Sequence, residues 1–302
     1  MVNNKELLER IGGLVLFDEP MSNHTTFHVG GPADILVIPK NIDDVKCCIA
    51  HAIVNRLPFH FIGNGSKLLV SDYGIRGMVI KFGHPLDSVT VSGEHITAEA
   101  GTSMSKIITI AKNNNLTGIE FAYGIPGTLG GAVVMNAGTN LGSMSKIVEK
   151  VTVLSPEDGS LHTLSKEDCC FGYRESAISK RGMAILEVEM RLKKDDNKKI
   201  EDLIVNLRER RNRIQPAEKY SAGSVFKNPQ GMPAGKLIES VGLKGFRKGG
   251  AKISEVHANF IINTDNASAA DVFFLIKLSQ KRVQDLFGVL LQPEIICLGK
   301  FE

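Results

Sequence analysis

The sequence predicts an α+β protein whose 302 residues are enough for two or three domains with ample core. A buried strand at residues 35–38, a helical pattern and a second strand at 59–62 make a small α/β unit. Strand patterns then dominate residues 78–192. A third region combines a strand at 258–262 with a helix at 271–287. Strands and helices are thus mixed within each region, which is typical of the α+β class.

The first region begins its helix at Asn41, whose side chain can accept a hydrogen bond from a helical N–H group. The apolar positions that follow keep helical spacing: Ile42, Val45, Ile49, Ala52 and Ile53. The strand at 59–62 runs directly into the loop Gly63-Asn64-Gly65-Ser66. Several backbone N–H groups close together can bind an anion, so this loop is a candidate anion-binding loop.

The second region contains a helix that Thr102 or Ser103 caps and that ends at residues 113–115. Further along, strands at 148–154 and 161–164 form a hairpin, and another strand covers 184–192.

Between these elements lies a glycine-rich segment at residues 121–138, with Gly124, Gly127, Gly130, Gly131 and Gly138. Glycine adopts positive φ and lets the backbone approach a ligand closely. Thr128 opens a short helical turn whose N–H groups would suit a pyrophosphate. A tight, buried loop between core strands explains the same glycines, so both interpretations stay open here. The segment matches neither the Walker pattern nor the common dinucleotide-binding fingerprint.

The third region follows a charged connection at residues 193–199. The next helix ends in four arginines, Arg208, Arg210, Arg211 and Arg213. They interact favourably with the helix dipole, or they attract a phosphate group, and the sequence leaves both readings open. Ser268 and Asp271 have capping-box spacing at the start of the last helix, and Gly288 ends it.

Composition limits the function classes. The net charge of +3 is too small to imply a nucleic-acid partner by itself. The five cysteines form no C-x-x-C pair and indicate reduced thiols in a cytoplasmic protein. We expect no signal peptide and no membrane span, because no apolar run approaches about 20 residues. No two histidines have metal-ligand spacing, so we expect no metal site, and we expect His24 and His28 to be hydrogen-bonded structural residues.

Six groups of residues, read in order along residues 24–294, give the chain a family resemblance. They are His24-Thr25-Thr26-Phe27 with Gly30-Gly31-Pro32-Ala33, Gly63-Asn64-Gly65-Ser66, Gly124-Ile125-Pro126-Gly127-Thr128-Leu129-Gly130-Gly131-Ala132, Gly172-Tyr173-Arg174-Glu175-Ser176, Gly223-Ser224-Val225-Phe226-Lys227-Asn228-Pro229 and Gln292-Pro293-Glu294. The chain closely resembles the UDP-N-acetylenolpyruvoylglucosamine reductase (MurB) family, flavoenzymes of bacterial peptidoglycan synthesis. It is most similar to the shorter, second-type subfamily, which lacks a long tyrosine-bearing insertion.

The resemblance implies an FAD-binding domain of the p-cresol methylhydroxylase/vanillyl-alcohol oxidase type in two parts, residues 1–82 and 83–207. A C-terminal α/β substrate domain would cover 208–296, and a strand at 297–302 could return to the first part. FAD would be bound without a covalent bond, through backbone N–H groups. The implied FAD contacts are Ile62, Gly63, Asn64, Gly65, Ser66, Gly124, Ile125, Pro126, Gly127, Thr128, Gly130, Gly131, Ala132 and Gly138.

The implied reaction is the NADPH-dependent reduction of an enol-ether double bond on a UDP-sugar. Arg174 would bind the substrate carboxylate, Glu294 would stay protonated through burial and donate a hydrogen bond to the same group, and Ser224 would deliver a proton to C2. Lys227 is the nearest cation in sequence that could help Ser224. The expected substrate contacts are Tyr173, Lys227 and Asn228. The resemblance further implies a cytoplasmic protein, expected to be a monomer, with no nucleic-acid or membrane partner and a role in cell-wall synthesis, cell shape and cell division.

Other interpretations compete with these roles. Arg174 would be structural if it paired with Glu175 or Glu187, Ser224 if it only softened a loop, and Glu294 if it were an exposed charge on an edge strand. A flavin oxidase of the same fold is the alternative enzyme. A covalent histidine link after the first glycine loop is not supported, because Gly65 is followed by Ser66-Lys67-Leu68. A non-catalytic nucleotide-sugar sensor is the alternative of another class, although a sensor has no use for a proton donor.

Overall fold

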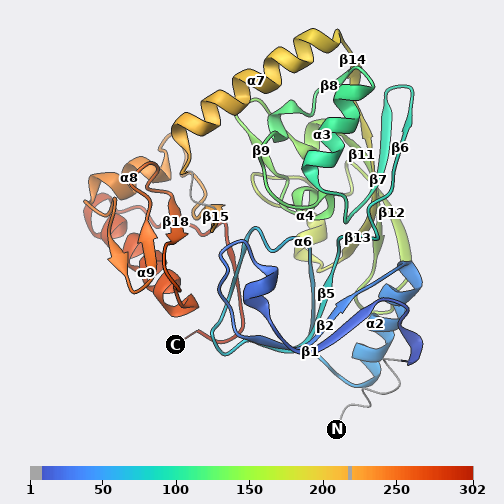
Figure 1. The fold of residues 1–302 in the computed structure, drawn as a ribbon, viewed down its shortest axis with the longest axis horizontal. Helices are drawn as coiled ribbons and strands as arrows, with labels where there is room; N and C mark the ends of the chain where they lie inside the picture. The colour runs from blue at the N-terminus through green and yellow to red at the C-terminus, as the bar shows by residue number, and fades with distance from the viewer. Residues whose placement is uncertain (1–8, 217–219, 302) are drawn as a thin grey trace. The chain divides into compact units, whose positions relative to one another are not determined.

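The computed structural model describes residues 9–216 and 220–301, and the chain divides into two compact units (Figure 1). The first unit comprises the residues up to Leu16, Ile35–Asn64 and Gly77–Arg210. The second unit comprises Phe17–Asp34, Gly65–Arg76 and the residues from Arg211 onward. Residues of the expected first part, 1–82, therefore contribute to both units, and the expected division into three parts stays a prediction.

The predicted α/β element of the first region is present. Strand β3 (Phe59–Ile62) pairs in parallel with β5 (Ile75–Lys81), in a sheet of order β1-β2-β5-β3 with β1 (Leu14–Pro20) and β2 (Pro32–Ile38). Helix α2 (Ile42–Val54) connects β2 to β3. Its predicted cap is confirmed, because the Asn41 side chain accepts a hydrogen bond from the Asp44 N–H at 2.9 Å.

The main sheet of the first unit is antiparallel, with the order β12-β11-β13-β7-β6. Its strands are β6 (Val89–Ser92), β7 (His95–Glu99), β11 (Val148–Leu154), β12 (Leu161–Ser165) and β13 (Ala184–Arg191). The predicted hairpin is confirmed, with Leu154 opposite Leu161. Helix α4 (Leu129–Val134) packs on β7 and β13. The glycine-rich segment is therefore mounted on this sheet.

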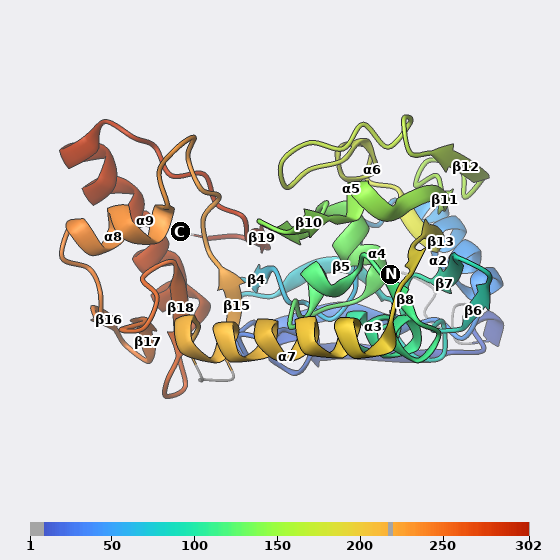
Figure 2. The same ribbon diagram turned by 90° about the horizontal axis from the view of Figure 1, so that it is seen from above.

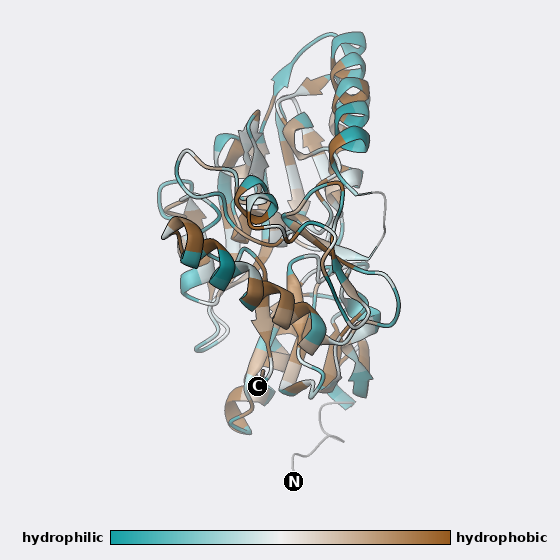
Figure 3. Ribbon diagram, turned by 90° about the vertical axis from the view of Figure 1, so that its left-hand side faces the viewer, coloured by the Kyte–Doolittle hydropathy of each residue, from teal (hydrophilic) through white to brown (hydrophobic). Residues whose placement is uncertain are grey.

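The remaining elements of the first unit are short, apart from two helices. Helix α3 (Met104–Asn113) is capped by Ser103, as predicted. The short elements are β8 (Leu116–Thr117), η2 (Glu120–Ala122), β9 (Gly138–Thr139), β10 (Gly142–Ser143), α5 (Met144–Ile147), α6 (Ala177–Lys180) and β14 (Lys193–Lys194). Helix α7 (Asn197–Ile214) begins beside α3, where Lys112 and Glu201 form an ion pair at 2.6 Å (Figure 2). It is mostly hydrophilic (Figure 3), and Ile200 is its buried contact with the core.

The second unit has a four-stranded sheet of order β15-β18-β17-β16. Its elements are η1 (Met21–His24), β4 (Leu68–Val70), β15 (Ser221–Ser224), α8 (Ala234–Ser240), β16 (Arg247–Lys248), β17 (Ala251–Ile253), β18 (Phe260–Asn263), α9 (Ala269–Phe287) and β19 (Ile296–Leu298). The predicted capping box of Ser268 and Asp271 is confirmed at the start of α9. Gly288, with φ of 68°, ends that helix in the left-handed conformation.

The last strand of the chain returns to residues that follow the first glycine loop. Strand β19 pairs in parallel with β4, with Ile296 opposite Leu68. The Ile296 N–H also donates to the Lys67 carbonyl at 2.8 Å. This pairing brings the segment that carries Glu294 beside Lys67.

Two further observations concern the chain as a whole. All five cysteines are free thiols, and burial raises the pKa of Cys48 to about 12 and that of Cys169 to about 11, so these two thiols are poor nucleophiles at neutral pH. Among residues 9–216 and 220–301, no helix combines the length and the apolar character that crossing a membrane requires.

Candidate active site

The glycine-rich segment of the first unit forms the predicted turn and short helix. Gly124 and Gly127 have φ of 72° and 125°, which favour glycine over residues with a Cβ. Thr128 then caps α4, with its hydroxyl oxygen accepting from the Gly131 N–H at 3.4 Å. Thr128, Gly130, Ala132 and Gly138 are buried, whereas Gly124, Pro126 and Gly131 are exposed. The segment thus has a buried, scaffold-forming side and an accessible side.

The first glycine loop meets this segment. A Cβ at Gly63 would collide with the Thr128 hydroxyl, so only glycine allows the end of β3 to lie so close to the start of α4. Ile62, just before it, is buried in the core, while Asn64 is exposed. Gly63 of the first candidate loop therefore lies against Thr128 of the second, and both residues belong to the first unit.

The free N–H groups on this surface are fewer than expected. The N–H groups of Leu129 and Gly130 donate to the carbonyls of Thr102 and Ala100 at 2.8 and 2.9 Å. The Gly131 N–H is engaged by Thr128, as described above. By contrast, the N–H groups of Gly63 and Asn64 donate to no group in the described parts of the chain. Among the candidate donors for a pyrophosphate, the N–H groups of Gly63 and Asn64 are therefore the ones that have no other acceptor in the described chain. That they bind one stays a prediction.

Two observations fit this surface to an extended polar cofactor such as FAD. A Cβ at Gly131 would make one ordinary contact, with Thr128 Oγ1 at 3.6 Å, and the residue is exposed, so this glycine lies at the surface and not in the core. The Thr102 hydroxyl is buried and has no hydrogen-bond partner within the described residues. Buried polar atoms are usually paired, so this hydroxyl is available to a bound group.

The loop that carries Arg174 is fastened to the glycine-rich segment. The Asn136 side chain donates to the Gly172 carbonyl at 2.8 Å. The Ser176 hydroxyl, fully buried, donates to the Val134 carbonyl at 2.7 Å. Residues of the glycine-rich segment therefore position the loop at 172–176. The spacing of the two motifs in the sequence could not show this contact.

Arg174 itself is held in an unusual conformation. Its φ of 59° is in the left-handed region, which costs energy for a residue with a Cβ. Its guanidinium donates to the Gly138 carbonyl at 2.6 Å and lies 5.2 Å from the centre of the Tyr173 ring. Glu175 pairs with Lys180 at 3.1 Å instead, so the idea that Arg174 is a partner of Glu175 is not supported. These contacts hold the Arg174 guanidinium, which is always charged and can donate two hydrogen bonds to one acceptor group, in a defined position.

In the second unit, the rest of the first glycine loop packs on the histidine-threonine motif. Gly65 has φ of 63°, and a Cβ there would collide with the His24 carbonyl. His24 pairs with Glu19 at 2.9 Å, and the His28 ring lies 4.2 Å from that of Tyr220. Both histidines therefore have the contacts of structural residues.

Ser224 ends strand β15, and the next two residues are hydrogen-bonded to Asn259. The Val225 N–H donates to the Asn259 backbone carbonyl at 2.8 Å, and the Phe226 N–H donates to the Asn259 side chain at 2.9 Å. Asn259 in turn donates to the Phe226 carbonyl at 2.8 Å. Asn259 was not predicted from the sequence, because its partners lie 33 residues away. A loop anchored in this way holds Ser224 in a defined place.

Glu294 lies against the same strand. Its side chain is buried, and its N–H donates to the Val225 carbonyl at 2.7 Å, so it is not the exposed edge charge considered as an alternative. The Lys67 ammonium lies 2.9 Å from Glu294 Oε1. The role implied for Glu294 stays a prediction, and Lys67 is a cation at this position that the sequence did not indicate.

The expected substrate-binding residues have differing surroundings. The Lys227 N–H donates to the Gln292 carbonyl at 2.9 Å. The Asn228 side chain accepts from the Ala234 N–H at 3.0 Å and so supports the start of α8. Tyr173 is exposed beside Arg174. A cation that the sequence did not indicate, Lys67, contacts the Ser224 segment: its Nζ donates to the Ser224 carbonyl at 2.8 Å, and the role expected for Lys227 stays a prediction.

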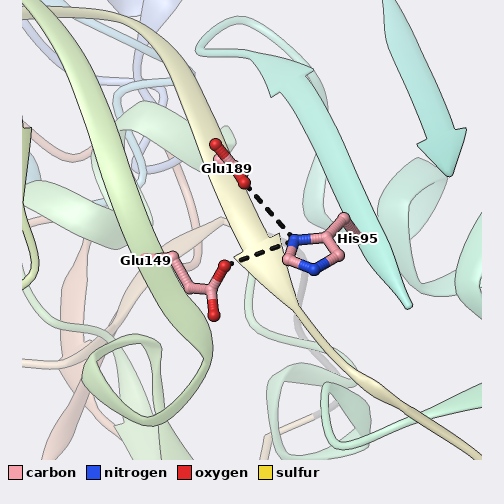
Figure 4. Close-up of side chains that lie close together, drawn as sticks. All are labelled: His95, Glu149 and Glu189. Atoms are coloured by element: carbon pink, nitrogen blue, oxygen red, sulfur yellow. Dashed lines mark ion pairs between the residues drawn. The ribbon is translucent and has the colours of Figure 1, made fainter. Parts of the chain in front are cut away.

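A separate polar cluster lies on the main sheet of the first unit (Figure 4). His95 Nδ1 is 3.3 Å from both Glu149 and Glu189. The three residues come from three neighbouring strands, β7, β11 and β13. This geometry could hold a metal ion, which the spacing of residues in sequence did not indicate. Lys150 and Arg191 lie 3.4 and 3.9 Å from the same carboxylates, however. These cations already balance the two acidic groups, which favours a cross-strand ion-pair network.

Two protein families match the chain. The family described as "UDP-N-acetylenolpyruvoylglucosamine reductase, C-terminal domain" matches residues 215–298. The family described as "FAD binding domain" matches residues 33–165. The first match covers the Ser224–Glu294 segment, and the second covers both glycine loops.

Full-length relatives share this organisation. Proteins named UDP-N-acetylenolpyruvoylglucosamine reductase from Alkaliphilus oremlandii and Clostridium tetani are 46% and 45% identical to this chain. The alignments cover 95% and 97% of this chain, and 94% and 95% of those proteins. A crystal structure of UDP-N-acetylenolpyruvylglucosamine reductase (MurB) from Thermus caldophilus is 35% identical, with a TM-score of 0.81 over 95% of this chain and 99% of that one.

A more distant likeness concerns the fold alone. A variant of Phl p 4 titled a glucose oxidase gives a TM-score of 0.53 at 13% identity, over 65% of this chain. This likeness shows a shared fold in part of the chain.

Proposed function

Because the chain belongs to the UDP-N-acetylenolpyruvoylglucosamine reductase family, we propose that it reduces UDP-N-acetyl-3-O-(1-carboxyvinyl)-glucosamine to UDP-N-acetylmuramate, with FAD as its bound cofactor and NADPH as the reductant. The reaction adds one hydride equivalent and one proton across the enol-ether double bond. It is therefore an oxidoreductase step of peptidoglycan synthesis.

We propose that the first unit holds FAD. The accessible N–H groups of Gly63 and Asn64, the open side of Gly131 and the unpartnered Thr102 hydroxyl support this assignment. The other expected contacts of the two glycine loops shape the surface by allowing close backbone approach. When bound, FAD supplies the transfer of a hydride equivalent from NADPH to C3 of the enolpyruvyl group.

Arg174 is assigned to the substrate carboxylate. Reduction at C3 puts negative charge on C2 and on the attached carboxylate, which becomes enolate-like. A guanidinium can donate two parallel hydrogen bonds to such a group, and it keeps its charge throughout. Tyr173, beside Arg174, is the expected neighbouring contact.

Ser224 is assigned as the group that gives C2 its proton. The O–H bond breaks as the new C2–H bond forms, and the serine regains a proton from solvent afterwards. A hydroxyl is a weak acid, so it needs favourable charges nearby. Glu294, with Lys67, is the charged pair at this position, and Lys227 and Asn228 are the expected contacts for the rest of the substrate.

One observation carries the proposal: the Arg174 guanidinium donates to the Gly138 carbonyl at 2.6 Å. This bond ties the residue assigned to the substrate carboxylate to the segment assigned to FAD. A non-catalytic sensor would have no use for a proton donor such as the one assigned to Ser224. The finer assignments, a cytoplasmic monomer that prefers NADPH and has no nucleic-acid or membrane partner, belong to the same proposal. So does a role in cell shape and division.

The experiment is anaerobic and follows the flavin absorbance. NADPH should bleach the yellow protein, and the enolpyruvyl UDP-sugar should then restore the colour without oxygen. A flavin oxidase would be recoloured by oxygen and not by the sugar. Acid treatment should release FAD into solution, because no histidyl or cysteinyl bond is expected. Flavin that remained with the precipitated polypeptide would favour the oxidase instead.

A further inference from the structure

Lys67 connects the two residues assigned to proton transfer. Its ammonium donates to the Ser224 carbonyl at 2.8 Å and lies 2.9 Å from Glu294 Oε1. All three residues belong to the second unit, so this arrangement does not depend on how the units are placed. An ammonium group has three donors, and two of them are used by these two partners.

The backbone fixes the position of Lys67 in this cluster. The Lys67 carbonyl accepts from the Ile296 N–H at 2.8 Å, two residues beyond Glu294. The Glu294 N–H in turn donates to the Val225 carbonyl at 2.7 Å, one residue beyond Ser224. The three segments are thus joined by backbone hydrogen bonds next to each side-chain contact. The backbone position from which the Lys67 side chain starts is therefore fixed relative to Ser224 and Glu294.

Burial makes the pair matter more than a surface ion pair. The Glu294 side chain is 9% exposed and that of Lys67 is 27% exposed. Removing one partner of a buried pair leaves the other charge uncompensated, which is far more costly than losing an exposed pair. The Glu294 carboxylate would then shift toward water or toward other donors, and the Ser224 segment would lose a hydrogen bond.

The positive charge of Lys67 is a second reason to connect this residue with the proposed reaction. The proposed substrate carries a carboxylate that becomes more negative as the reaction proceeds. An isolated Glu294 carboxylate would repel that charge, since like charges a few ångströms apart interact strongly in a site with little water. The Lys67 ammonium, 2.9 Å from Glu294 Oε1, would offset this repulsion.

We propose that Lys67 is a positioning residue for proton delivery: it holds Ser224 and Glu294 in register and neutralises Glu294 while negative charge develops on the substrate. This inference rests on the proposed function and adds a residue to it. The plain alternative is a stabilising ion pair with no influence on the reaction. The two readings differ in which half-reaction changes and in whether the effects of Lys67 and Glu294 depend on each other.

The test uses the FAD-loaded protein and four variants, Lys67→Met, Lys67→Arg, Glu294→Gln and the double variant Lys67→Met with Glu294→Gln. Stopped-flow absorbance measures flavin reduction by NADPH and reoxidation by the enolpyruvyl UDP-sugar separately. Lys244→Met is the matched control, because Lys244 forms an ion pair of the same 2.9 Å length with Glu239 in the same unit, but on an exposed surface.

For Lys67→Met we expect reoxidation about 10- to 100-fold slower, with reduction by NADPH changed less than about twofold, because a lost second-layer contact commonly costs this much. Lys67→Arg should recover most of the rate, since it keeps the charge. In the Glu294→Gln background, Lys67→Met should slow reoxidation by a smaller factor than in the wild type, because the part of its effect that passes through Glu294 is already lost. Lys244→Met should reoxidise like the wild type.

A second readout does not need turnover. Urea unfolding midpoints of the same cycle should be non-additive if Lys67 and Glu294 form a partly buried pair. Reoxidation of Lys67→Met at the wild-type rate, or independent, multiplicative effects of the two substitutions, would overturn the inference. Failure of the wild-type protein to be reoxidised by the sugar is a different result, because it would reject the proposed function and this inference with it.

Discussion

Two regions differ in the groups that they offer to a ligand: the glycine surface of the first unit and the Lys67–Ser224–Glu294 cluster of the second unit. The first is made of backbone: glycines without Cβ atoms, carbonyls and N–H groups. The second is made of side chains, with one ammonium between a carboxylate and a backbone carbonyl. Backbone suits a cofactor that must simply stay bound, because its donors cannot titrate or change rotamer. Side chains suit a reaction, because their charge and acidity can be tuned.

The difference predicts how each region fails. A change in the glycine surface should alter occupancy by the cofactor, with little effect on the chemistry of whatever remains loaded. A change in the charged cluster should leave the cofactor in place and slow one step. Each prediction below tests one side of this contrast.

The largest effects are expected at two adjacent glycines. A Cβ at Gly130 would lie 2.9 Å from Ala100 Cβ, in the buried contact between α4 and the sheet. Gly130→Val should therefore give little or no soluble protein. A Cβ at Gly131 would make only an ordinary contact with Thr128 Oγ1 at 3.6 Å, so Gly131→Val should fold. It should nevertheless be purified almost colourless, because the side chain would fill the surface proposed for FAD.

Yield, circular dichroism and flavin content per polypeptide measure the two outcomes. Gly131→Ala is the control for the backbone effect of replacing glycine in a helix, and we expect it to retain more flavin than the valine variant. A folded Gly131→Val protein with full flavin content would remove Gly131 from the cofactor surface. Equal loss of folding in both valine variants would contradict the division into a buried side and an accessible side.

The next largest effect is expected at Ser224. Ser224→Ala should bind FAD and be reduced by NADPH normally, because the hydroxyl is needed only for the proton to C2. Reoxidation by the enolpyruvyl UDP-sugar should slow by about 10²-fold or more, the usual scale for losing a positioned acid. Ser224→Cys should keep part of the rate, since a thiol is also a proton donor.

Ser221→Ala is a matched control for this prediction, because Ser221 begins the same strand, β15. It should reoxidise at the wild-type rate. Substrate binding by Ser224→Ala, measured by the change in flavin absorbance of the oxidised protein, should change much less than the rate. An alanine variant that reoxidises like the wild type would eliminate Ser224 as the proton donor.

Local signals in the sequence were sufficient for most of the fold. The Asn41 cap, the hairpin of β11 and β12 and the capping box at Ser268 all follow from residues close together in the chain, and all are confirmed. Such patterns depend on hydrogen bonds and burial within a few residues. The two compact units were not predictable in the same way, because residues 17–34 and 65–76 join the C-terminal residues through contacts distant in sequence.

The site shows the same limit. The motifs identified both glycine loops and the loop of Arg174, but not that Gly63 packs on Thr128 or that Asn136 holds Gly172. The sequence indicates Lys227 as the cation nearest to Ser224, whereas Lys67 lies 157 residues from Ser224 along the chain and contacts it only in the folded protein. Its one signal was its position directly after the Gly63-Asn64-Gly65-Ser66 motif.

A smaller effect is expected from pH, and it concerns the support of the side-chain cluster. His257 Nδ1 accepts from the Asn259 N–H at 3.2 Å, and Asn259 holds the residues after Ser224. Burial lowers the pKa of His257, and Lys244 lowers it further, against an opposing effect of Glu239. The unfolded chain, with an ordinary histidine pKa near 6.5, therefore takes up the proton first as the pH falls.

The free energy of unfolding should accordingly decrease as the pH falls below about 6.5 and stay flat with respect to this group above it. His257→Gln, which is neutral at every pH, should flatten part of this decrease, while His60, whose pKa is also lowered by burial, accounts for another part. Urea unfolding at several pH values measures the slope, with the exposed His162→Gln as the control. An unchanged slope in His257→Gln would show that the Asn259 contact does not depend on a neutral His257.

The smallest effect is expected at the cluster of His95, Glu149 and Glu189, which belongs to neither region and tests whether charge alone marks a functional site. Its side chains are 40%, 34% and 29% exposed, and Lys150 and Arg191 accompany the carboxylates. Exposed pairs of this kind contribute little, so His95→Gln should change the free energy of unfolding by less than about 1 kcal/mol and leave both half-reactions unchanged. Zinc or manganese ions should not raise the unfolding temperature of the wild-type protein, because Lys150 and Arg191 compete with a metal ion for the same carboxylates. A rise with added metal that His95→Gln abolishes would instead identify a metal site on this sheet. It would also show that a set of ligands from three strands can outweigh the neighbouring positive charges.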